Sequence, residues 1–95
     1  MITLSDKERK IVLDILNKYP HKFYVFGSRA KNRAKRLSDL DLCYKEPISL
    51  NTLAHLEEDF EESDLPFKVD FVDFWSCSEN FRKAIQPDLV PIKPQ

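Results

Sequence analysis

Hydrophobic positions recur at helical spacing in two long stretches of the chain and alternate, or run together, in the shorter stretches between them. A capping box at residues 5–8 predicts that the first helix begins there, and Pro20 ends it after about Lys18. Residues 22–26 are aromatic and β-branched, which predicts a short buried strand. The apolar stripe of the predicted helix consists of Ile11, Val12, Ile15 and Leu16.

The second half of the chain also alternates between strand-like and helix-like spacing of its hydrophobic residues. Residues 39–44 alternate strictly and predict a strand with two unlike faces. A helix is expected from about Ser49 to Glu62, a third strand over residues 67–72, and a short helix opened by a second capping box at residues 76–79 and ending near Ile85. The tail from Leu89 is expected to form an edge strand or an extended arm. The alternating strand would place Leu40, Leu42 and Tyr44 on one face and Asp39, Asp41 and Cys43 on the other.

This order of elements predicts an α/β (α+β) fold, with a small mixed sheet of three or four strands and helices packed on it in two layers. The chain has 95 residues, enough for one thin core, and contains no repeat or linker. We therefore expect a single domain over residues 1–95. With so few strands, one edge of the sheet is expected to be exposed.

Composition and charge exclude several classes of protein. Apolar residues make up 42% of the chain, as in globular proteins, but no run approaches the ~20 residues of a membrane span and no secretory signal opens the chain. Cys43 and Cys77 lack metal-site or disulfide-framework spacing, which predicts free thiols in a cytoplasmic protein.

The net charge is −1, yet residues 29–36 carry five positive charges and residues 57–64 carry six negative ones. Each run is a solvated face or a docking surface.

The stretch from Gly27 to Leu42 holds the candidate chemistry. Gly27 is the only glycine, and it stands with Ser28 where a strand is expected to turn into a helix. Free backbone N–H groups at a helix start favour anions, glycine allows a phosphate to approach, and Ser28 adds a hydroxyl. Arg29 and the basic residues after it would supply countercharge. This basic segment is expected to form a short helix closed by a left-handed turn at Asn32.

Three aspartates complete the pattern. Asp39 and Asp41 are two residues apart on a predicted strand, so both carboxylates would project from one face. Asp70 lies inside the next apolar strand, where a carboxylate is costly unless it is paired or bound to a metal. Oxygen ligands of this kind suit Mg²⁺ or Mn²⁺, and two such ions beside a phosphate cradle are typical of transfer from a nucleoside triphosphate.

Each feature alone has a simpler explanation. Gly27-Ser28 also fits an ordinary turn, Asp39 and Asp41 fit a strand face exposed to solvent, and Asp70 fits a buried carboxylate that is hydrogen-bonded to the protein. Their combination, with ten residues between Ser28 and Asp39, resembles the nucleotidyltransferase superfamily that includes DNA polymerase β and kanamycin nucleotidyltransferase. The short chain and the sequences GSRA, SDLDL and VDFVD resemble its minimal (MNT) branch, from the first helix to Ile92.

The resemblance implies roles for particular residues. Gly27 and Ser28, with Arg29 beside them, would bind the nucleotide phosphates. Asp39 and Asp41 would hold the metal ions and act in catalysis. The third acid would be Asp70, because Asp73 falls on the opposite face by alternation, although a contribution from Asp73 is left open. Lys31-Asn32 replaces the second glycine that many members have after GSRA, which affects the loop more than the acids.

The resemblance also implies a function. A minimal nucleotidyltransferase lacks a module to hold the acceptor, and such proteins are often paired with a small helical HEPN toxin. The chain would then be the antitoxin, moving AMP from ATP onto a tyrosine hydroxyl of that toxin and releasing pyrophosphate, with two Mg²⁺ ions. The nucleotide base, the acceptor, and self-association into a homo-oligomer are left open.

Two other hypotheses remain. The chain could neutralise a partner protein by contact alone, with a vestigial nucleotide site. It could also bind nucleic acid through residues 29–36, although this segment lacks interleaved aromatic residues and the net charge is not basic.

Overall fold

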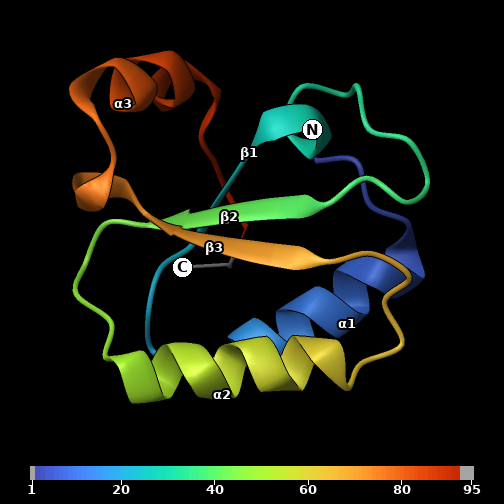
Figure 1. Ribbon diagram of the computed structural model, residues 1–95. Coiled ribbons are helices and arrows are strands. Elements are labelled where there is room, and N and C mark those ends of the chain that lie inside the picture. Colours follow the sequence, from blue (N-terminus) through green and yellow to red (C-terminus); the bar gives the residue numbers. More distant parts are fainter. Residues whose placement is uncertain (1, 93–95) are drawn as a thin grey trace.

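The computed structural model describes residues 2–92 and contains a four-stranded mixed sheet with helices on both faces (Figure 1). The strands run in the order β3-β2-β1-β4, with β1 antiparallel to β2 and β4, and β2 parallel to β3. The mixed sheet and the α/β class confirm the predicted fold. The elements are α1 (Asp6–Leu16), β1 (Tyr24–Phe26), β2 (Leu40–Tyr44), α2 (Leu50–Glu61), β3 (Val69–Asp73), α3 (Glu79–Ile85) and β4 (Val90–Pro91), with 3₁₀ turns η1 (Gly27–Arg29), η2 (Phe74–Ser76) and η3 (Gln86–Asp88).

The two faces of the sheet are covered unequally. Helices α1 and α2 lie together on one face, and α3 lies on the other (Figure 1). The larger core packs between the sheet and the α1–α2 pair, and its fully buried side chains include Leu40, Leu42 and Leu56. A smaller cluster on the α3 face contains Phe26, Cys43, Phe74 and Ile85. The fold therefore has the two predicted layers plus a partial third layer formed by α3.

The first predicted helix cap is confirmed and the second is wrong. Ser5 accepts a hydrogen bond from the Glu8 N–H, and the Glu8 carboxylate accepts one from the Ser5 N–H, which is the predicted capping box. The short helix α3 is instead capped by Ser78, two residues after the predicted position. Ser76 lies in η2, two residues before the N-cap of α3, and its hydroxyl donates to Asp73.

The basic segment does not form the predicted helix. Only Gly27–Arg29 adopts a 3₁₀ turn, and the chain then runs through irregular turns to β2. Asn32 has a φ of 59°, which confirms the predicted left-handed conformation and stops helical propagation. The Arg29 side chain donates hydrogen bonds to the carbonyl oxygens of Lys35, Arg36 and Ser38 in this irregular segment.

The tail forms the edge strand β4, which pairs with β1 as one of the two predicted outcomes; residues 93–95 lie outside the described residues. Cys43 and Cys77 are both free thiols, as predicted, and burial raises the pKa of Cys43 to about 11. Among residues 2–92, no helix combines the length and the apolar character that crossing a membrane requires.

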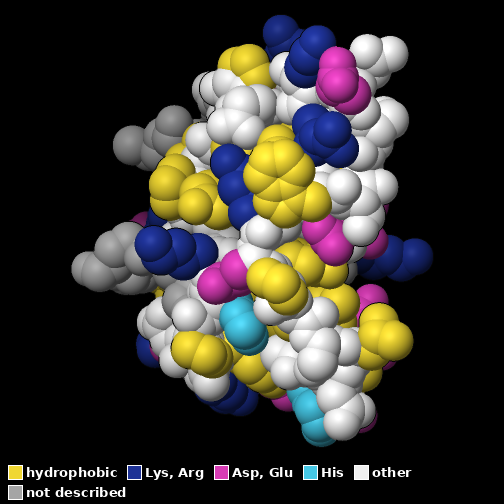
Figure 2. Space-filling model, turned by 90° about the vertical axis from the view of Figure 1, so that its left-hand side faces the viewer, with side chains coloured by type: hydrophobic (Ala, Val, Ile, Leu, Met, Phe, Trp, Pro, Cys, Tyr) yellow, Lys and Arg dark blue, Asp and Glu magenta, His cyan; other side chains and the backbone are white. Residues whose placement is uncertain are grey.

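Hydrophobic side chains gather on the upper half of the side shown in Figure 2, over η2 and α3, with Lys and Arg side chains among them. The large exposed side chains in these elements are Trp75, 63% exposed, and Phe81, 41% exposed. Phe74 covers the core edge, whereas Trp75 stacks edge-on against it and remains in solvent. The guanidinium of Arg82 lies 5.6 Å from the centroid of the Trp75 ring.

Candidate functional site

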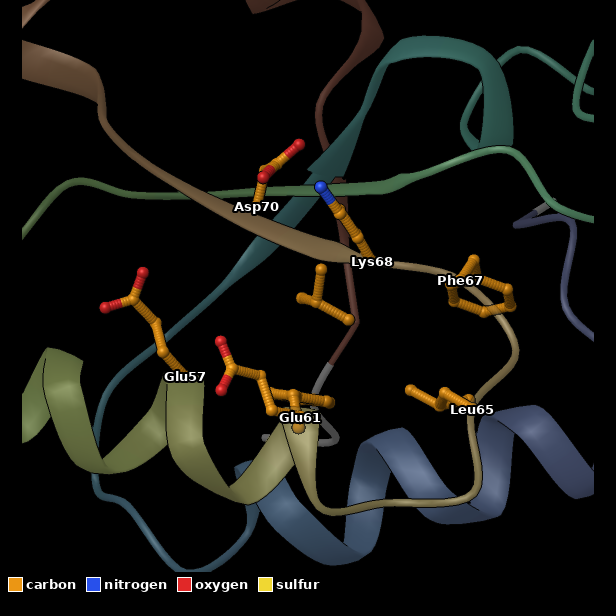
Figure 3. A pocket seen from close by; sticks show the side chains of 8 residues that line it. Glu57, Glu61, Leu65, Phe67, Lys68 and Asp70 are labelled. Atoms are coloured by element: carbon orange, nitrogen blue, oxygen red, sulfur yellow. The ribbon is translucent and has the colours of Figure 1, made fainter.

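Two of the three aspartates face each other across neighbouring strands. Asp41 of β2 is paired in register with Asp70 of β3, because these strands are parallel and aligned residue for residue. Alternation along β2 places Leu40 and Leu42 against α1 and α2, so Asp41 lies on the opposite face, as predicted. Asp70 also points away from α2 (Figure 3). The sequence-predicted acids of the two strands therefore meet on the face that α3 only partly covers.

The electrostatics of Asp41 connect it to both other acids. Burial raises its pKa above the usual aspartate range, and the negative charges of Asp70 and then Asp39 raise it further. Asp39 immediately precedes β2 and is exposed. Three carboxylates thus share one electrostatic environment, in which like charges repel unless a cation lies between them.

Gly27 is required where it stands for two reasons. Its φ is +76°, which L side chains rarely adopt, and a Cβ built at this position would lie only 2.5 Å from Oδ2 of Asp41. The predicted phosphate loop and the predicted metal ligand are therefore in direct contact. Ser28 follows in η1 and is half-buried, with its carbonyl accepting a hydrogen bond from the Arg33 N–H.

Arg29 differs from its expected role as a phosphate contact. Its side chain is buried, with 2% exposure, and its guanidinium lies 3.9 Å from the centroid of the Phe67 ring. It donates to the carbonyl oxygens of Thr3 at 2.8 Å and Ser38 at 2.7 and 3.0 Å, and also to those of Lys35 and Arg36. These bonds involve all three guanidinium nitrogens, and they tie the N-terminal segment and the loop before Asp39 to η1.

The N-terminal segment contacts the candidate site, which no pattern in the sequence predicts. The Thr3 N–H donates to the Arg29 carbonyl at 2.8 Å, and the Arg29 side chain bonds back to the Thr3 carbonyl. The segment around Thr3 therefore lies beside η1. No residue pattern at positions 2–4 signals this contact, because it depends on backbone atoms that every residue carries.

Asp73 differs from the three acids in its hydrogen bonds as well as in its position on β3. Its carboxylate accepts hydrogen bonds from the Trp75 N–H and the Ser76 hydroxyl, both at 3.0 Å, and so caps η2. Its charge acts on Tyr44, which faces the α1–α2 core, and helps to raise the Tyr44 pKa after the larger effect of burial. The predicted preference for Asp70 over Asp73 therefore agrees with the orientation of both residues.

The donor set suits a hard divalent cation. Among residues 2–92, no three His, Cys, Asp or Glu side chains already surround a common point. Magnesium is usually held by one or two carboxylates together with substrate phosphates rather than by a complete protein cage. Two adjacent oxygen ligands, Asp41 and Asp70, beside a glycine whose missing side chain leaves room for the Asp41 carboxylate, fit that kind of site.

Comparisons with known proteins agree with this geometry. The family model described as polymerase beta, nucleotidyltransferase matches residues 10–92. The chain is 38% identical to the Haemophilus influenzae protein named "Probable protein adenylyltransferase MntA", over 97% of this chain and 84% of that protein. It is also 38% identical to MJ0126 of Methanocaldococcus jannaschii, a candidate protein adenylyltransferase by name, over 97% of this chain and all of that protein.

A solved structure shares the fold. One chain of a crystal structure of a toxin–antitoxin with AMP-PNP superposes with a TM-score of 0.66 at 21% identity, covering 88% of this chain and 71% of that one. At this identity the likeness concerns the arrangement of strands and helices. It is consistent with the order and the mixed directions of the strands described above.

Proposed function

Because the chain belongs to the polymerase β nucleotidyltransferase family, we propose that it transfers AMP from ATP to a hydroxyl group of a partner protein and releases pyrophosphate. The observation that carries this proposal is the pairing of Asp41 with Asp70 beside Gly27 and Ser28. The names of the curated relatives support a protein as the acceptor.

Residues of this chain would bind the reactants as follows. The backbone N–H groups at the start of η1 and the Ser28 hydroxyl would bind the β- and γ-phosphates, and the missing side chain of Gly27 lets the Asp41 carboxylate lie close to them. Arg29 would keep the loop before Asp39 in position. Asp39, Asp41 and Asp70 would hold divalent cations, which this family uses and which we propose to be Mg²⁺. When bound, such ions neutralise the triphosphate and lower the pKa of an acceptor hydroxyl.

The chemical step balances without a further reactant. The acceptor oxygen forms a bond to the α-phosphorus, the bond between that phosphorus and the bridging oxygen of the β-phosphate breaks, and pyrophosphate leaves. The hydroxyl proton passes to the Asp70 carboxylate and then to solvent. Asp41 is suited to hold a cation here, because burial and then the negative charges of Asp70 and Asp39 raise its pKa, and a bound cation would stabilise the charged carboxylate against both effects.

The acceptor that we infer is a tyrosine of a helical HEPN toxin, which would make this chain the antitoxin. This finer assignment depends on the family resemblance. A cytoplasmic location is part of the same proposal. The second candidate function is neutralisation of a partner by contact, which the exposed aromatic residues Trp75 and Phe81 favour.

A labelling experiment tests the proposal. The chain is incubated with Mg²⁺, a HEPN protein as the proposed partner, and ATP labelled either at the α- or at the γ-phosphate. We expect the partner to acquire the α-label only. Asp39→Asn/Asp41→Asn should abolish the labelling, and the matched control Asp14→Asn/Asp64→Asn, at two exposed positions, should retain it. Absence of labelling, with full protection of cells by Asp39→Asn/Asp41→Asn, would instead establish the contact mechanism.

A further inference from the structure

A groove runs between α2 and the outer side of β3, and it reaches the candidate site (Figure 3). Its volume is about 400 Å³, large enough for several side chains of a bound segment. Glu57 and Glu61 point from α2 toward β3, and Lys68 and Asp70 point away from α2 on the strand side. The apolar part of the lining is formed by Phe60, Leu65, Phe67 and Val69.

The strand that borders the groove has an unpaired edge. β3 is the outermost strand of the sheet, and within residues 2–92 only β2 pairs with it. Alternate backbone N–H and C=O groups of an edge strand point outward and can pair with an extended segment of another chain. Helix α2 lies beside this edge without covering it, since the groove separates them.

The charges of the groove specify what would bind there. Glu57 and Glu61 are one helical turn apart and both exposed, and neither forms an ion pair with any residue of the described part of the chain. Like charges at this spacing repel each other. With Asp70, the groove carries three carboxylates against the single ammonium of Lys68. A basic segment would be attracted, whereas the phosphate backbone of a nucleic acid would be repelled.

We propose that this groove docks an extended, basic segment of the acceptor protein, which pairs with the free edge of β3 and brings its hydroxyl to Asp70. The proposal depends on the proposed function for the identity of Asp70 as the acid nearest the acceptor. Asp70 belongs both to the groove lining and to the Asp41–Asp70 pair, so a segment lying along β3 necessarily passes the carboxylates. The groove would thereby supply the acceptor platform that a minimal chain otherwise lacks.

The test uses two synthetic peptides of about nine residues, enough to cover one strand. One alternates lysine with threonine around a central tyrosine, and the other has glutamate in place of lysine. We expect the chain to bind the lysine peptide and not the glutamate peptide. Glu57→Lys/Glu61→Lys should weaken this binding by about tenfold or more. The matched control Glu58→Lys/Glu62→Lys changes the charge equally, at one residue of α2 and at its C-cap, outside the groove lining, and should weaken the binding by less than about threefold.

A second measurement locates the peptide. Hydrogen exchange at residues 69–73 should slow when the lysine peptide is added, because outward amides become paired. Equal effects of the two double variants, equal binding of both peptides, no binding of either, or protection elsewhere would each overturn the proposal.

The docking proposal and the proposed function fail separately. If Glu57→Lys/Glu61→Lys labels the HEPN partner at the rate of the unmodified chain, the groove is not the acceptor platform but the transfer reaction stands. If the lysine peptide binds in the groove but no AMP is transferred to any acceptor, the groove binds basic segments and the transferase proposal falls. Binding of Mg²⁺-ATP should be equal in both double variants, since neither changes the three aspartates.

Discussion

The two faces of the sheet are built from the same strands, but one presents apolar side chains to the core and the other presents carboxylates. On the α1–α2 face, Leu40 and Leu42 of β2 are completely buried. On the α3 face, the same strand presents Asp41, and the neighbouring strand presents the exposed Asp70. Cys43, farther along β2, is covered by Phe74 and Ile85, so α3 shields one part of this face and leaves the carboxylates accessible.

This difference shows how a chain of 95 residues accommodates both a core and a site. The period of two in a strand lets every second residue stabilise the fold while the others remain available for binding. Substitutions on the α1–α2 face should therefore affect stability, and substitutions on the open part of the α3 face should affect chemistry.

The largest effect is expected at Leu42. Leu42→Ala would leave a cavity between the sheet and its helices, and should lower the free energy of unfolding by about 3–5 kcal/mol. The matched control is Leu50→Ala, because Leu50 is 84% exposed and should change stability by less than about 0.5 kcal/mol. Urea unfolding measures both, and similar values for the two variants would contradict the division between the faces.

On the opposite face, Asp70→Asn should slow AMP transfer by about 100-fold or more, equivalent to about 2.7 kcal/mol of barrier, with little change in stability. The control is Asp73→Asn, only three residues away. Asparagine can still accept the hydrogen bond from the Trp75 N–H, so this variant should keep most of the activity. Initial rates of α-label transfer decide between them; the reverse order would move the third acid to Asp73.

Arg29→Lys separates a positioning role from direct phosphate binding. An ammonium cannot reproduce the fork of bonds to the Thr3 and Ser38 carbonyls, so the free energy of unfolding should fall by about 2 kcal/mol. Arg33→Lys, at an exposed position, should change it by less than about 0.5 kcal/mol. Retained stability with a higher KM for ATP would show that Arg29 contacts the phosphates.

The smallest expected effect concerns cations at Asp41. Mg²⁺ at ten times its Kd should stabilise the chain by about 1.4 kcal/mol, measured as a shift of the unfolding transition. Asp41→Asn should lose most of this shift, whereas Asp14→Asn, at an exposed position on α1, should keep it. Equal shifts in both variants would place the cation elsewhere.

The pH dependence without cations follows from the raised pKa of Asp41. A carboxyl whose pKa is higher in the folded than in the unfolded state favours folding when it is protonated. The contribution of Asp41 to the free energy of unfolding is fully present below the ordinary aspartate pKa of about 3.9. It is lost as the pH rises through the pKa of Asp41 in the folded state. Asp41→Asn should therefore gain stability relative to the unmodified chain as the pH rises from about 4 to 7, measured by urea unfolding at each pH.

Much of this structure could be predicted from local patterns. The capping box at Ser5 correctly predicts where α1 begins, and the alternation of residues 39–44 correctly predicts the strand β2. The errors lie where side chains have competing partners. Ser76 lies in η2 and bonds to Asp73, while Ser78 caps α3. For Arg29, local pattern did not predict burial against carbonyls of distant segments, and its expected contact with phosphate stays a prediction.

The sequence by itself determined which residues could share a face, because side-chain direction in a strand depends only on the parity of the residue number. It therefore placed Asp39 with Asp41, and Asp70 apart from Asp73. Only the tertiary structure decided that β2 and β3 are aligned with Asp41 opposite Asp70, that Gly27 touches Asp41, and that Arg29 is buried. Those facts depend on strand register and on contacts between distant segments, which the packing of the whole core fixes and no local pattern encodes.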